Sequence, residues 1–237
     1  MITKVVIAAA GQGTRMQQLT KDKSKHLILV NGRPFLSYVL DNLSAAGYND
    51  TTLVVGHESG LIEQFLKENN YRVKVINQFE ILGPKEKEYG TACPLKCIKD
   101  INEQFLYICG DNFYSVGDLK SMDINDGYNY VAGIKNDHPE DFGVLVSDGE
   151  LLKEIVEKPK QFVGDAVNTS LYKFTPEIFE KVFQIKKSIR GEYEITDAVS
   201  MLAGEKKVKV KMIKDFWMDF GKPEDIEKMS KFLNGNN

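Results

Sequence analysis

Apolar and polar positions alternate in two different ways along the chain, and the change falls near its middle. In the first half, runs rich in β-branched and aromatic residues predict strands. These runs are Lys4–Ala9, Thr51–Val55, Val73–Asn77 and Phe105–Cys109. Helical spacing of apolar residues predicts one helix that begins at Pro34 and ends at Gly47, and a second helix around Leu61–Leu66.

In the second half, predicted strands follow one another with little helix between them. They lie near Tyr130–Ile134, Gly143–Val146, Leu152–Glu157 and Asp165–Phe174. Helices are predicted after Pro176, over Ile195–Ala203 with Gly204 as the stop signal, and over Pro223–Leu233. Lys207–Lys214 alternates lysine with apolar residues, which favours a half-exposed strand whose lysines face water over a phosphate-binding patch.

The β-α alternation followed by a strand-rich half is typical of an α/β fold. We predict a single domain over residues 1–237. Its centre is expected to be a Rossmann-like, mixed and mainly parallel sheet flanked by helices. The change in pattern divides the domain into halves at residues 1–115 and 116–237.

Composition excludes several classes of protein. With 42% hydrophobic and 27% charged residues and no apolar run near the roughly 18 residues of a membrane span, we expect a soluble protein. A net charge of -3 argues against a broad surface for nucleic acid. The first apolar run lacks the features of a secretory signal, so we expect a cytoplasmic protein. Cys93, Cys97 and Cys109 are too few for a disulfide framework or a four-ligand zinc site and are expected to be buried thiols.

Glycines and cations follow the first predicted strand. Gly11 and Gly13 stand where a buried strand emerges at its carboxyl end, and glycines there let backbone N–H groups approach phosphate oxygens. Arg15 and Lys25 add positive charge. A dinucleotide-binding fingerprint fails because Met16 stands where a third glycine belongs, and a Walker-type loop fails because the required Gly-Lys pair is absent here. The loop therefore predicts a triphosphate-binding turn.

Two aspartates interrupt apolar stretches far apart in the sequence. Asp111 ends the strand-like run before it, and Asp219 lies in Trp217–Gly221. A carboxylate in such a place is costly to bury without a metal or a charged partner. Magnesium prefers a few carboxylate oxygens completed by substrate phosphates, so the pair predicts a Mg²⁺ site.

Several segments together resemble the sugar-1-phosphate nucleotidyltransferases, a family that includes glucose-1-phosphate thymidylyltransferases and uridylyltransferases. The matching segments are Gly11–Met16 with Leu19-Thr20, Lys25, Gly32–Pro34, Gly110–Asn112, Glu157–Pro159 and Trp217–Gly221. The likeness implies the GT-A-like fold of the nucleotide-diphospho-sugar transferases. It also implies that residues 1–115 bind nucleotide and residues 116–237 bind sugar phosphate.

The resemblance implies a role for each matching residue. Arg15 would hold the departing pyrophosphate, Lys25 would neutralise charge beside the α-phosphate, and Lys158 would contact the sugar phosphate. Asp111 and Asp219 would bind Mg²⁺, the expected cofactor. The implied nucleotide-binding residues are Ala8, Ala10, Gly11, Gly13, Thr14, Gln78, Gly90 and Thr91, and the implied sugar-binding residues are Gly143, Glu157, Asn168, Tyr172 and Glu194.

Departures from the family pattern concern specificity rather than phosphate chemistry. The family often has proline where Gln18, Ser24 and Leu29 stand. It often has glycine where Ser170 stands, and the larger serine side chain would narrow the pocket. The amide of Gln78 suits the N3–H and O4 edge shared by uracil and thymine, which favours UTP or dTTP. An acidic residue at position 194 also fits a helix-start cap equally well.

The expected reaction joins a nucleoside triphosphate, UTP or dTTP, to a sugar 1-phosphate such as glucose 1-phosphate. No nucleic acid or membrane partner is expected, and a homo-oligomer is compatible with the sequence. Two alternatives stay open. A cytidylyltransferase for phosphocholine or a similar phospho-alcohol shares the first loop and the aspartates, although Glu157–Pro159 favours a sugar. A non-catalytic nucleotide-binding regulatory subunit has no physical need for both metal carboxylates.

Overall fold

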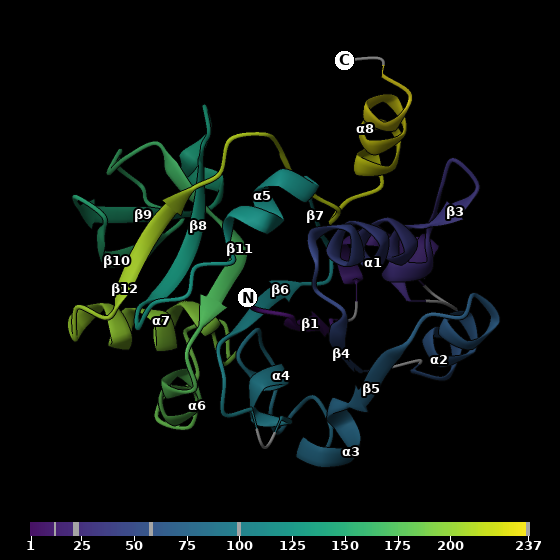
Figure 1. The fold of residues 1–237 in the computed structure, drawn as a ribbon, viewed down its shortest axis with the longest axis horizontal. Helices are drawn as coiled ribbons and strands as arrows, with labels where there is room; N and C mark the ends of the chain where they lie inside the picture. The colour runs from purple at the N-terminus through teal and green to yellow at the C-terminus, as the bar shows by residue number, and fades with distance from the viewer. Residues whose placement is uncertain (12, 21–23, 57–58, 99–100, 236–237) are drawn as a thin grey trace.

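The computed structural model describes residues 1–11, 13–20, 24–56, 59–98 and 101–235. Gln12 of the first loop and the side chains of Thr14 and Gln18 lie outside this description. Within it, a nine-stranded sheet runs through the molecule in the order β5-β4-β1-β6-β11-β8-β12-β10-β9 (Figure 1).

Each strand of this sheet lies where the sequence pattern predicts one. The strands are β1 (Lys4–Ala9), β4 (Asp50–Val55), β5 (Val73–Asn77), β6 (Phe105–Cys109), β8 (Asn129–Lys135), β9 (Gly143–Asp148), β10 (Leu151–Glu157), β11 (Ala166–Phe174) and β12 (Val208–Met212). Burial on both faces of the sheet explains the apolar run of the first strand: Val5 and Ile7 are fully buried in the core on one face, and Val6 is fully buried in the core on the other.

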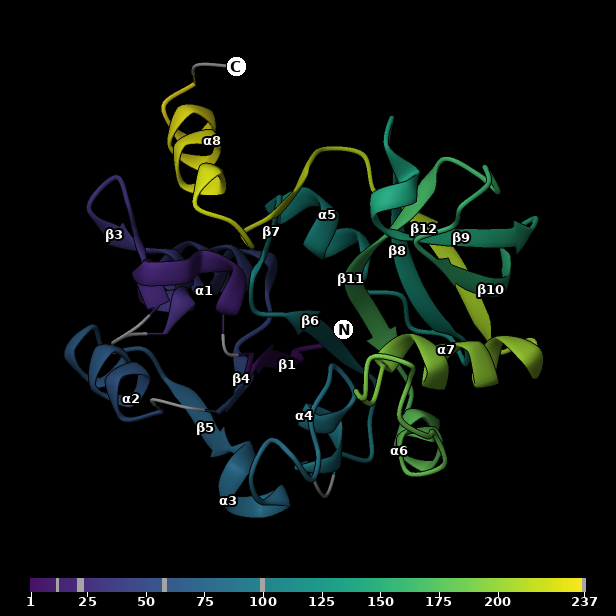
Figure 2. The same cartoon turned by 180° about the vertical axis from the view of Figure 1, so that it is seen from behind.

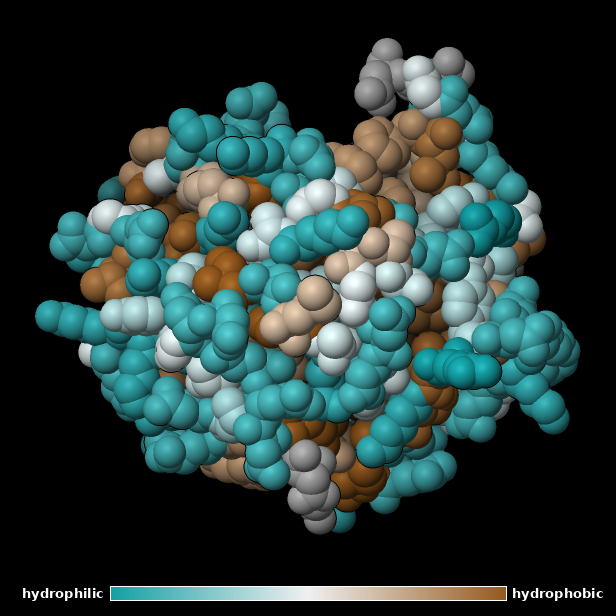
Figure 3. Space-filling model, viewed as in Figure 1, coloured by the Kyte–Doolittle hydropathy of each residue, from teal (hydrophilic) through white to brown (hydrophobic). Residues whose placement is uncertain are grey.

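Helices cover both faces of the sheet. They are α1 (Phe35–Ala46), α2 (Ser59–Glu68), α3 (Gln78–Leu82), α4 (Cys93–Lys96), α5 (Val116–Ser121), α6 (Glu177–Val182), α7 (Ile195–Gly204) and α8 (Glu224–Leu233). Helices α1, α5 and α8 lie on one side, and α4, α6 and α7 lie on the other (Figure 1; Figure 2). Figure 3 shows a mostly hydrophilic face on which apolar side chains gather at the base of α8, where the buried Met229 joins the core.

The sheet is mixed, as predicted, but its parallel part is smaller than expected. Strands β5, β4, β1 and β6 are parallel, whereas β11 runs antiparallel to both β6 and β8. Four of the eight neighbouring pairings are parallel. The reason is local: the second half lacks crossover helices between most of its strands, so hairpin pairings such as β9 with β10 replace parallel ones. Strand β9 also pairs with β11, which curls this half back on itself.

The ends of two helices show where the sequence signals succeed and fail. Gly47 ends α1 with a φ of 102°, a conformation that favours glycine. Gly204 does not stop α7 but is its last residue, and Lys206 takes the left-handed conformation instead, with a φ of 58°.

Strand β12 confirms the predicted lysine strand, and Lys209 Nζ lies 3.3 Å from a carboxylate oxygen of Glu150.

Short elements escape the periodicity argument because they hold only a few residues each. They include the 3-10 helices η1 (Thr14–Thr20), η2 (Lys25–Leu27) and η3 (Pro139–Asp141), and two small antiparallel pairs, β2 (Leu29–Val30) with β3 (Arg33–Pro34) and β7 (Asn112–Tyr114) with β13 (Trp217–Asp219). Among the described residues, no helix has the length and apolar character needed to cross a membrane.

Candidate active site

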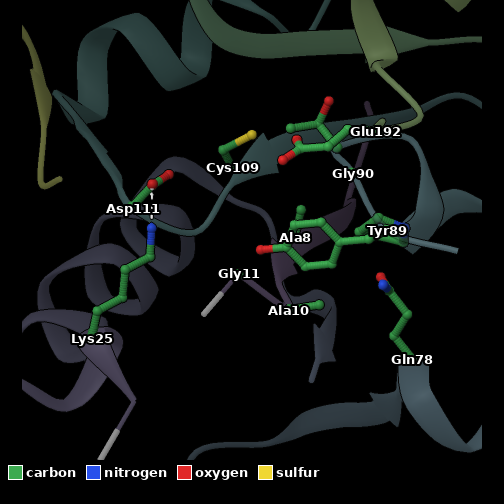
Figure 4. Close-up of a pocket in the computed structure, with 12 residues that line it drawn as sticks. Ala8, Ala10, Gly11, Lys25, Gln78, Tyr89, Gly90, Cys109, Asp111 and Glu192 are labelled. Carbon is green, nitrogen blue, oxygen red and sulfur yellow. Dashed lines mark hydrogen bonds and ion pairs between the residues drawn. The ribbon is translucent and has the colours of Figure 1, made fainter. Parts of the chain in front are cut away.

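A pocket enclosing about 510 Å³ of space, part of it open to solvent, lies at the carboxyl ends of β1 and β6 (Figure 4). Its walls contain eight of the predicted site residues: Ala8, Ala10, Gly11, Lys25, Gln78, Gly90, Thr91 and Asp111. They come from segments that span a hundred residues of sequence, and the parallel pairing of β1 with β6 brings the two central strand ends together.

The first loop turns tightly beneath the pocket. Gly13 has a φ of 63°, and a Cβ atom there would lie 3.1 Å from Thr20 Cγ2 and 3.2 Å from Lys25 Cβ. The Thr20 hydroxyl donates a hydrogen bond to the Gly13 carbonyl at 3.0 Å. Glycine at this position therefore serves both conformation and close packing.

Arg15 lies beside the second aspartate rather than inside the pocket walls. Its guanidinium stands so close to Gly221 that a Cβ atom on that residue would be 3.2 Å from it. Arg15 Nη1 is 4.0 Å from Asp219 Oδ2, and 60% of the Arg15 side chain is exposed. The Arg15 guanidinium therefore packs against Gly221 and lies near the Asp219 carboxylate, and its exposed side can bind an anion.

The two aspartates are neighbours because β7 and β13 pair. Asp219 stands opposite Asn112 in this antiparallel pair, and the Phe220 N–H donates to the Asp111 carbonyl at 2.7 Å. The Lys25 ammonium forms an ion pair with Asp111 Oδ2. The sequence places these aspartates 108 positions apart, and a contact between two short strands joins them.

The electrostatics of the two carboxyls differ. Burial alone would raise the pKa of Asp111, but the Lys25 charge and hydrogen bond lower that pKa below its ordinary value. Burial raises the pKa of Asp219 to about 6, and the neighbouring Asp111 carboxylate contributes in the same direction. A site that crowds two carboxylates in this way favours a bound cation.

The donor set limits which metal the site suits. In the part of the chain that the structure describes, no group of three or more His, Cys, Asp or Glu side chains is arranged to hold a metal ion. Two carboxylates leave most coordination positions to water and phosphate oxygens. That incomplete oxygen set fits Mg²⁺ and does not fit a structural zinc site.

Gln78 is an unpartnered polar side chain in the pocket wall. It begins α3 and has 1% of its surface exposed. Neither Gln78 Nε2 nor Gln78 Oε1 has a hydrogen-bond partner among the described residues. The amide points toward the pocket (Figure 4). Because a buried amide without partners is costly, a ligand with both a donor and an acceptor would fit here.

A second loop closes this side of the pocket and contacts the start of α7. Gly90 has a φ of 130°, and a Cβ atom there would lie 2.4 Å from the Tyr193 carbonyl oxygen. The Thr91 hydroxyl accepts a hydrogen bond from the Ile195 N–H at 2.9 Å and lies 3.5 Å from Glu194 Oε2. Glu194 stands at the N-cap position of α7, as the helix-start alternative predicts, but its side chain makes no capping hydrogen bond.

The predicted sugar-binding residues form a separate cluster beyond the pocket. Arg190 Nη2 lies 2.9 Å from Glu194 Oε1 and 3.9 Å from Glu157 Oε1, joining two predicted sugar-binding carboxylates. Lys158 is exposed and has a φ of 43°, with its N–H donating to the Phe142 carbonyl at 2.9 Å.

Three residues of this cluster have packing roles that the sequence did not predict. Gly143 pairs with Glu157, and a Cβ atom on it would lie 3.1 Å from Glu157 Oε2, so close packing explains the glycine. Asn168 Nδ2 donates to the Tyr172 hydroxyl at 2.6 Å. Tyr172 itself is fully buried, so its direct contact with a sugar is not supported, and its hydroxyl orients Asn168 instead. Ser170 has a φ of 59°, which explains a preference for glycine at this bulge.

A nucleotidyl transferase family model matches residues 4–236. The chain belongs to this family. Similar proteins include the UTP–glucose-1-phosphate uridylyltransferase AglF of Haloferax volcanii, 32% identical over 239 residues that cover 97% of this chain and 96% of that protein. A bifunctional sugar-1-phosphate nucleotidylyltransferase/acetyltransferase of Sulfurisphaera tokodaii is 32% identical over 98% of this chain, but the chain spans only 56% of its length.

A solved structure with the same fold comes from Bacillus anthracis. This protein, described as a glucose-1-phosphate thymidylyltransferase, superposes with a TM-score of 0.82 and 26% identity over 99% of this chain and 96% of that one. The resemblance inferred from the motifs and the mixed α/β fold of the family are confirmed.

Several residues at the pocket and beside the predicted sugar-binding cluster were not predicted from the sequence. Arg190 is one, although its place four residues before Glu194 is a usable signal. Tyr89, Glu192 and Cys109 line the pocket as well. Cys109 is half-buried, Cys93 and Cys97 are buried, and all three thiols are free, as expected. Burial raises the pKa of the Cys109 thiol to about 12, which leaves it an unreactive wall residue.

Proposed function

We propose that this nucleotidyl transferase joins a nucleoside triphosphate, UTP or dTTP, to a hexose 1-phosphate such as glucose 1-phosphate, releasing pyrophosphate. The observation that carries the proposal is the meeting of Lys25, Asp111, Asp219 and Arg15 at the edge of the pocket. Two cations and two carboxylates beside a glycine turn suit a reaction between two phosphate groups.

In the proposed reaction, an oxygen of the sugar phosphate attacks the α-phosphorus in line. A new P–O bond forms as the bond to the β-phosphate oxygen breaks, and the electron pair leaves with pyrophosphate. Arg15 neutralises the leaving group, and Lys25 lies beside the α-phosphate. Asp111 and Asp219 would hold Mg²⁺, which supplies charge neutralisation to both phosphates when bound. Because the attacking oxygen is already ionised, the step needs no protein nucleophile or general base.

The nucleotide preference rests on Gln78. Its buried amide offers one donor and one acceptor to a base, and the N3–H and O4 edge of uracil or thymine presents the complementary pair. The names of the relatives differ in the nucleotide, since a guanyltransferase stands beside a uridylyltransferase and a thymidylyltransferase, so GTP is tested together with UTP and dTTP.

The sugar side rests on the second cluster. Glu157, Asn168 and Glu194 offer acceptors to sugar hydroxyls, and the exposed Lys158 offers a charge to the sugar phosphate. Arg190 bridges two of these carboxylates and is an additional contact for the phosphate. With nucleotide bound by residues 1–115 and sugar phosphate by residues 116–237, we propose one domain acting in the cytoplasm.

The test is a matrix of ATP, GTP, CTP, UTP and dTTP against glucose 1-phosphate, other sugar 1-phosphates and phosphocholine, with and without Mg²⁺. Pyrophosphate release is the readout. Turnover with UTP or dTTP and a sugar 1-phosphate, dependent on Mg²⁺, is the expected result. Turnover only with CTP and phosphocholine would contradict the sugar 1-phosphate hypothesis and support a cytidylyltransferase. Nucleotide binding without any turnover would support a regulatory subunit.

A further inference from the structure

Asn112 occupies the first position of β7 and is almost fully buried, with 4% of its surface exposed. Its Oδ1 accepts a hydrogen bond from Trp217 Nε1 at 2.5 Å, and its Nδ2 donates to Asp111 Oδ1 at 3.0 Å. The two bonds form a chain from the indole through the amide to the carboxylate.

The chemistry of the two neighbours fixes the orientation of this amide. An indole N–H can only donate, so the atom that faces Trp217 must be Oδ1. An ionised carboxylate can only accept, so the atom that faces Asp111 must be Nδ2. Without the indole donor, only the bond to the carboxylate holds the amide, and the position of that amide is less firmly fixed.

Asp111 is consequently held at both of its oxygens. Asn112 binds Oδ1, and the Lys25 ammonium pairs with Oδ2. The backbone carbonyl of Asp111 is also bound, by the Phe220 N–H. The lone pairs left over point in a direction set by these contacts, which is what a metal-binding carboxylate needs.

The ring of Trp217 contacts the sugar side of the molecule. Its edge-to-face contact with Phe142 has a centroid distance of 5.3 Å and an interplanar angle of 69°. The carbonyl of Phe142 accepts the hydrogen bond from the Lys158 N–H. Trp217 therefore contacts both Asn112, which binds the predicted metal ligand Asp111, and Phe142, which binds the backbone of Lys158.

We propose that Trp217 is a positioning residue for the transfer reaction. Through Asn112, its indole N–H sets the orientation of Asp111, and through Phe142, its ring sets the turn that carries Lys158. The inference rests on the proposed function. It assigns a role in the reaction to a residue that contacts neither the metal nor a phosphate.

Trp217→Phe keeps an aromatic ring and removes the N–H. We expect kcat to fall about tenfold, the effect of one net hydrogen bond, and the Mg²⁺ concentration for half-maximal activity to rise. The KM for the sugar phosphate should stay within about twofold, because the contact with Phe142 is kept. The matched control is Tyr48→Phe, which removes a buried hydroxyl bonded to the Leu119 carbonyl at 3.0 Å. Neither residue lines the pocket, so kcat should be unchanged.

A second measurement avoids both catalysis and the folding of the Trp217 variant. The chain has one tryptophan, so its ¹H–¹⁵N spectrum contains one indole N–H signal, which reports this hydrogen bond directly. Mg²⁺ should move the signal in the wild-type protein and leave it in place in Asp111→Asn. Asn112→Leu, which keeps the branched shape of the side chain and removes its polar atoms, should shift the signal without metal and lower kcat as Trp217→Phe does.

A failure of the proposed function would appear as no turnover by the wild-type protein with any substrate pair. Two other outcomes would overturn the positioning role alone. If the wild-type protein turns over and Trp217→Phe keeps its kcat and Mg²⁺ requirement, the positioning role is wrong. An indole signal that ignores Mg²⁺ while catalysis depends on it would overturn the link to Asp111.

Discussion

At the residue scale, the site depends on carboxylates and cations that stand where strands end. Asp111 is held by Lys25 and Asn112, and Asp219 is brought beside it by the pairing of β7 with β13. The geometry therefore assigns charge to fixed positions before any substrate arrives, which is the arrangement that preorganised electrostatic catalysis requires.

The charge of Asp111 is the first target for mutation. Asp111→Asn keeps the shape of the side chain and removes the charge that would hold the metal, so we expect kcat to fall by about 10² to 10³ in the presence of Mg²⁺. Steady-state pyrophosphate release measures the effect. Asp50→Asn removes an exposed carboxylate paired with Lys4 and serves as the control, with kcat unchanged. Near-normal turnover of Asp111→Asn would refute the metal role.

His26 predicts a specific dependence of stability on pH. It is 1% exposed, and burial, helped by the Lys25 charge, lowers its pKa from 6.5 to about 3. Between those values the unfolded chain binds a proton that the folded chain does not, so this stability is full above pH 6.5 and is lost as the pH falls toward 3. The slope from this residue is at most about 1.4 kcal/mol per pH unit.

Urea denaturation between pH 7 and pH 4 measures that slope. We expect the free energy of unfolding of His26→Gln to fall less steeply with decreasing pH than that of the wild-type protein. His138→Gln is the matched control, because its side chain is 76% exposed, and its slope should follow the wild type. Equal slopes for all three proteins would contradict the assignment.

At the element scale, the loop at the nucleotide pocket and the segment that leads into α7 behave as one unit. The Tyr193 N–H donates to the Tyr89 carbonyl at 2.8 Å, and the Ala92 N–H donates to the Tyr193 carbonyl at 2.9 Å. Lys96 lies over the Tyr193 ring at 3.6 Å and pairs with Glu88 at 2.7 Å. The residues proposed to contact the base and the sugar therefore lie on segments that cannot shift independently.

Gly90→Ala tests this joint. The added methyl group would meet the Tyr193 backbone and force a non-glycine residue into a φ of 130°, so both segments must move. We expect the KM values for the nucleotide and for the sugar phosphate to rise together, each by about tenfold or more. Gly127→Ala, which meets nothing within 4 Å, is the control. A rise in the nucleotide KM alone would mean that the two segments respond separately.

At the scale of the whole molecule, the two halves share their cores. One core joins Ile7 and Leu36 of the first half to Tyr130 and Leu171 of the second, and β6 pairs with β11 across the junction. Neither half can expose its side of the sheet without exposing the other's apolar residues. This packing favours a single cooperative unit over two independent lobes.

We expect unfolding of the wild-type protein to occur in one transition. Far-ultraviolet circular dichroism follows the whole backbone, and the fluorescence of Trp217 follows the junction, so the two denaturation curves should coincide. Two separate transitions, or curves with different midpoints, would show that residues 1–115 and 116–237 unfold as separate domains.

The order of residues along the chain is enough to predict the strands of the main sheet, the glycine and cation pattern of the first loop, and the family. These features are local: a strand buried on both faces reads as a short continuous apolar run, a half-buried strand alternates with a two-residue period, and a phosphate-binding turn needs its glycines and cations close together in the chain. Helix ends were less secure, as Gly204 shows, because several residues near a terminus can end a helix.

Which strand ends meet follows from the three-dimensional packing of the chain. The antiparallel placement of β11 beside β6, the pairing of Asp219 with Asn112, and the ion pair of Arg190 with Glu157 all join residues distant in sequence. No local period encodes such pairings. They follow from how the whole chain buries its two cores, and that packing turns separate motifs into one site.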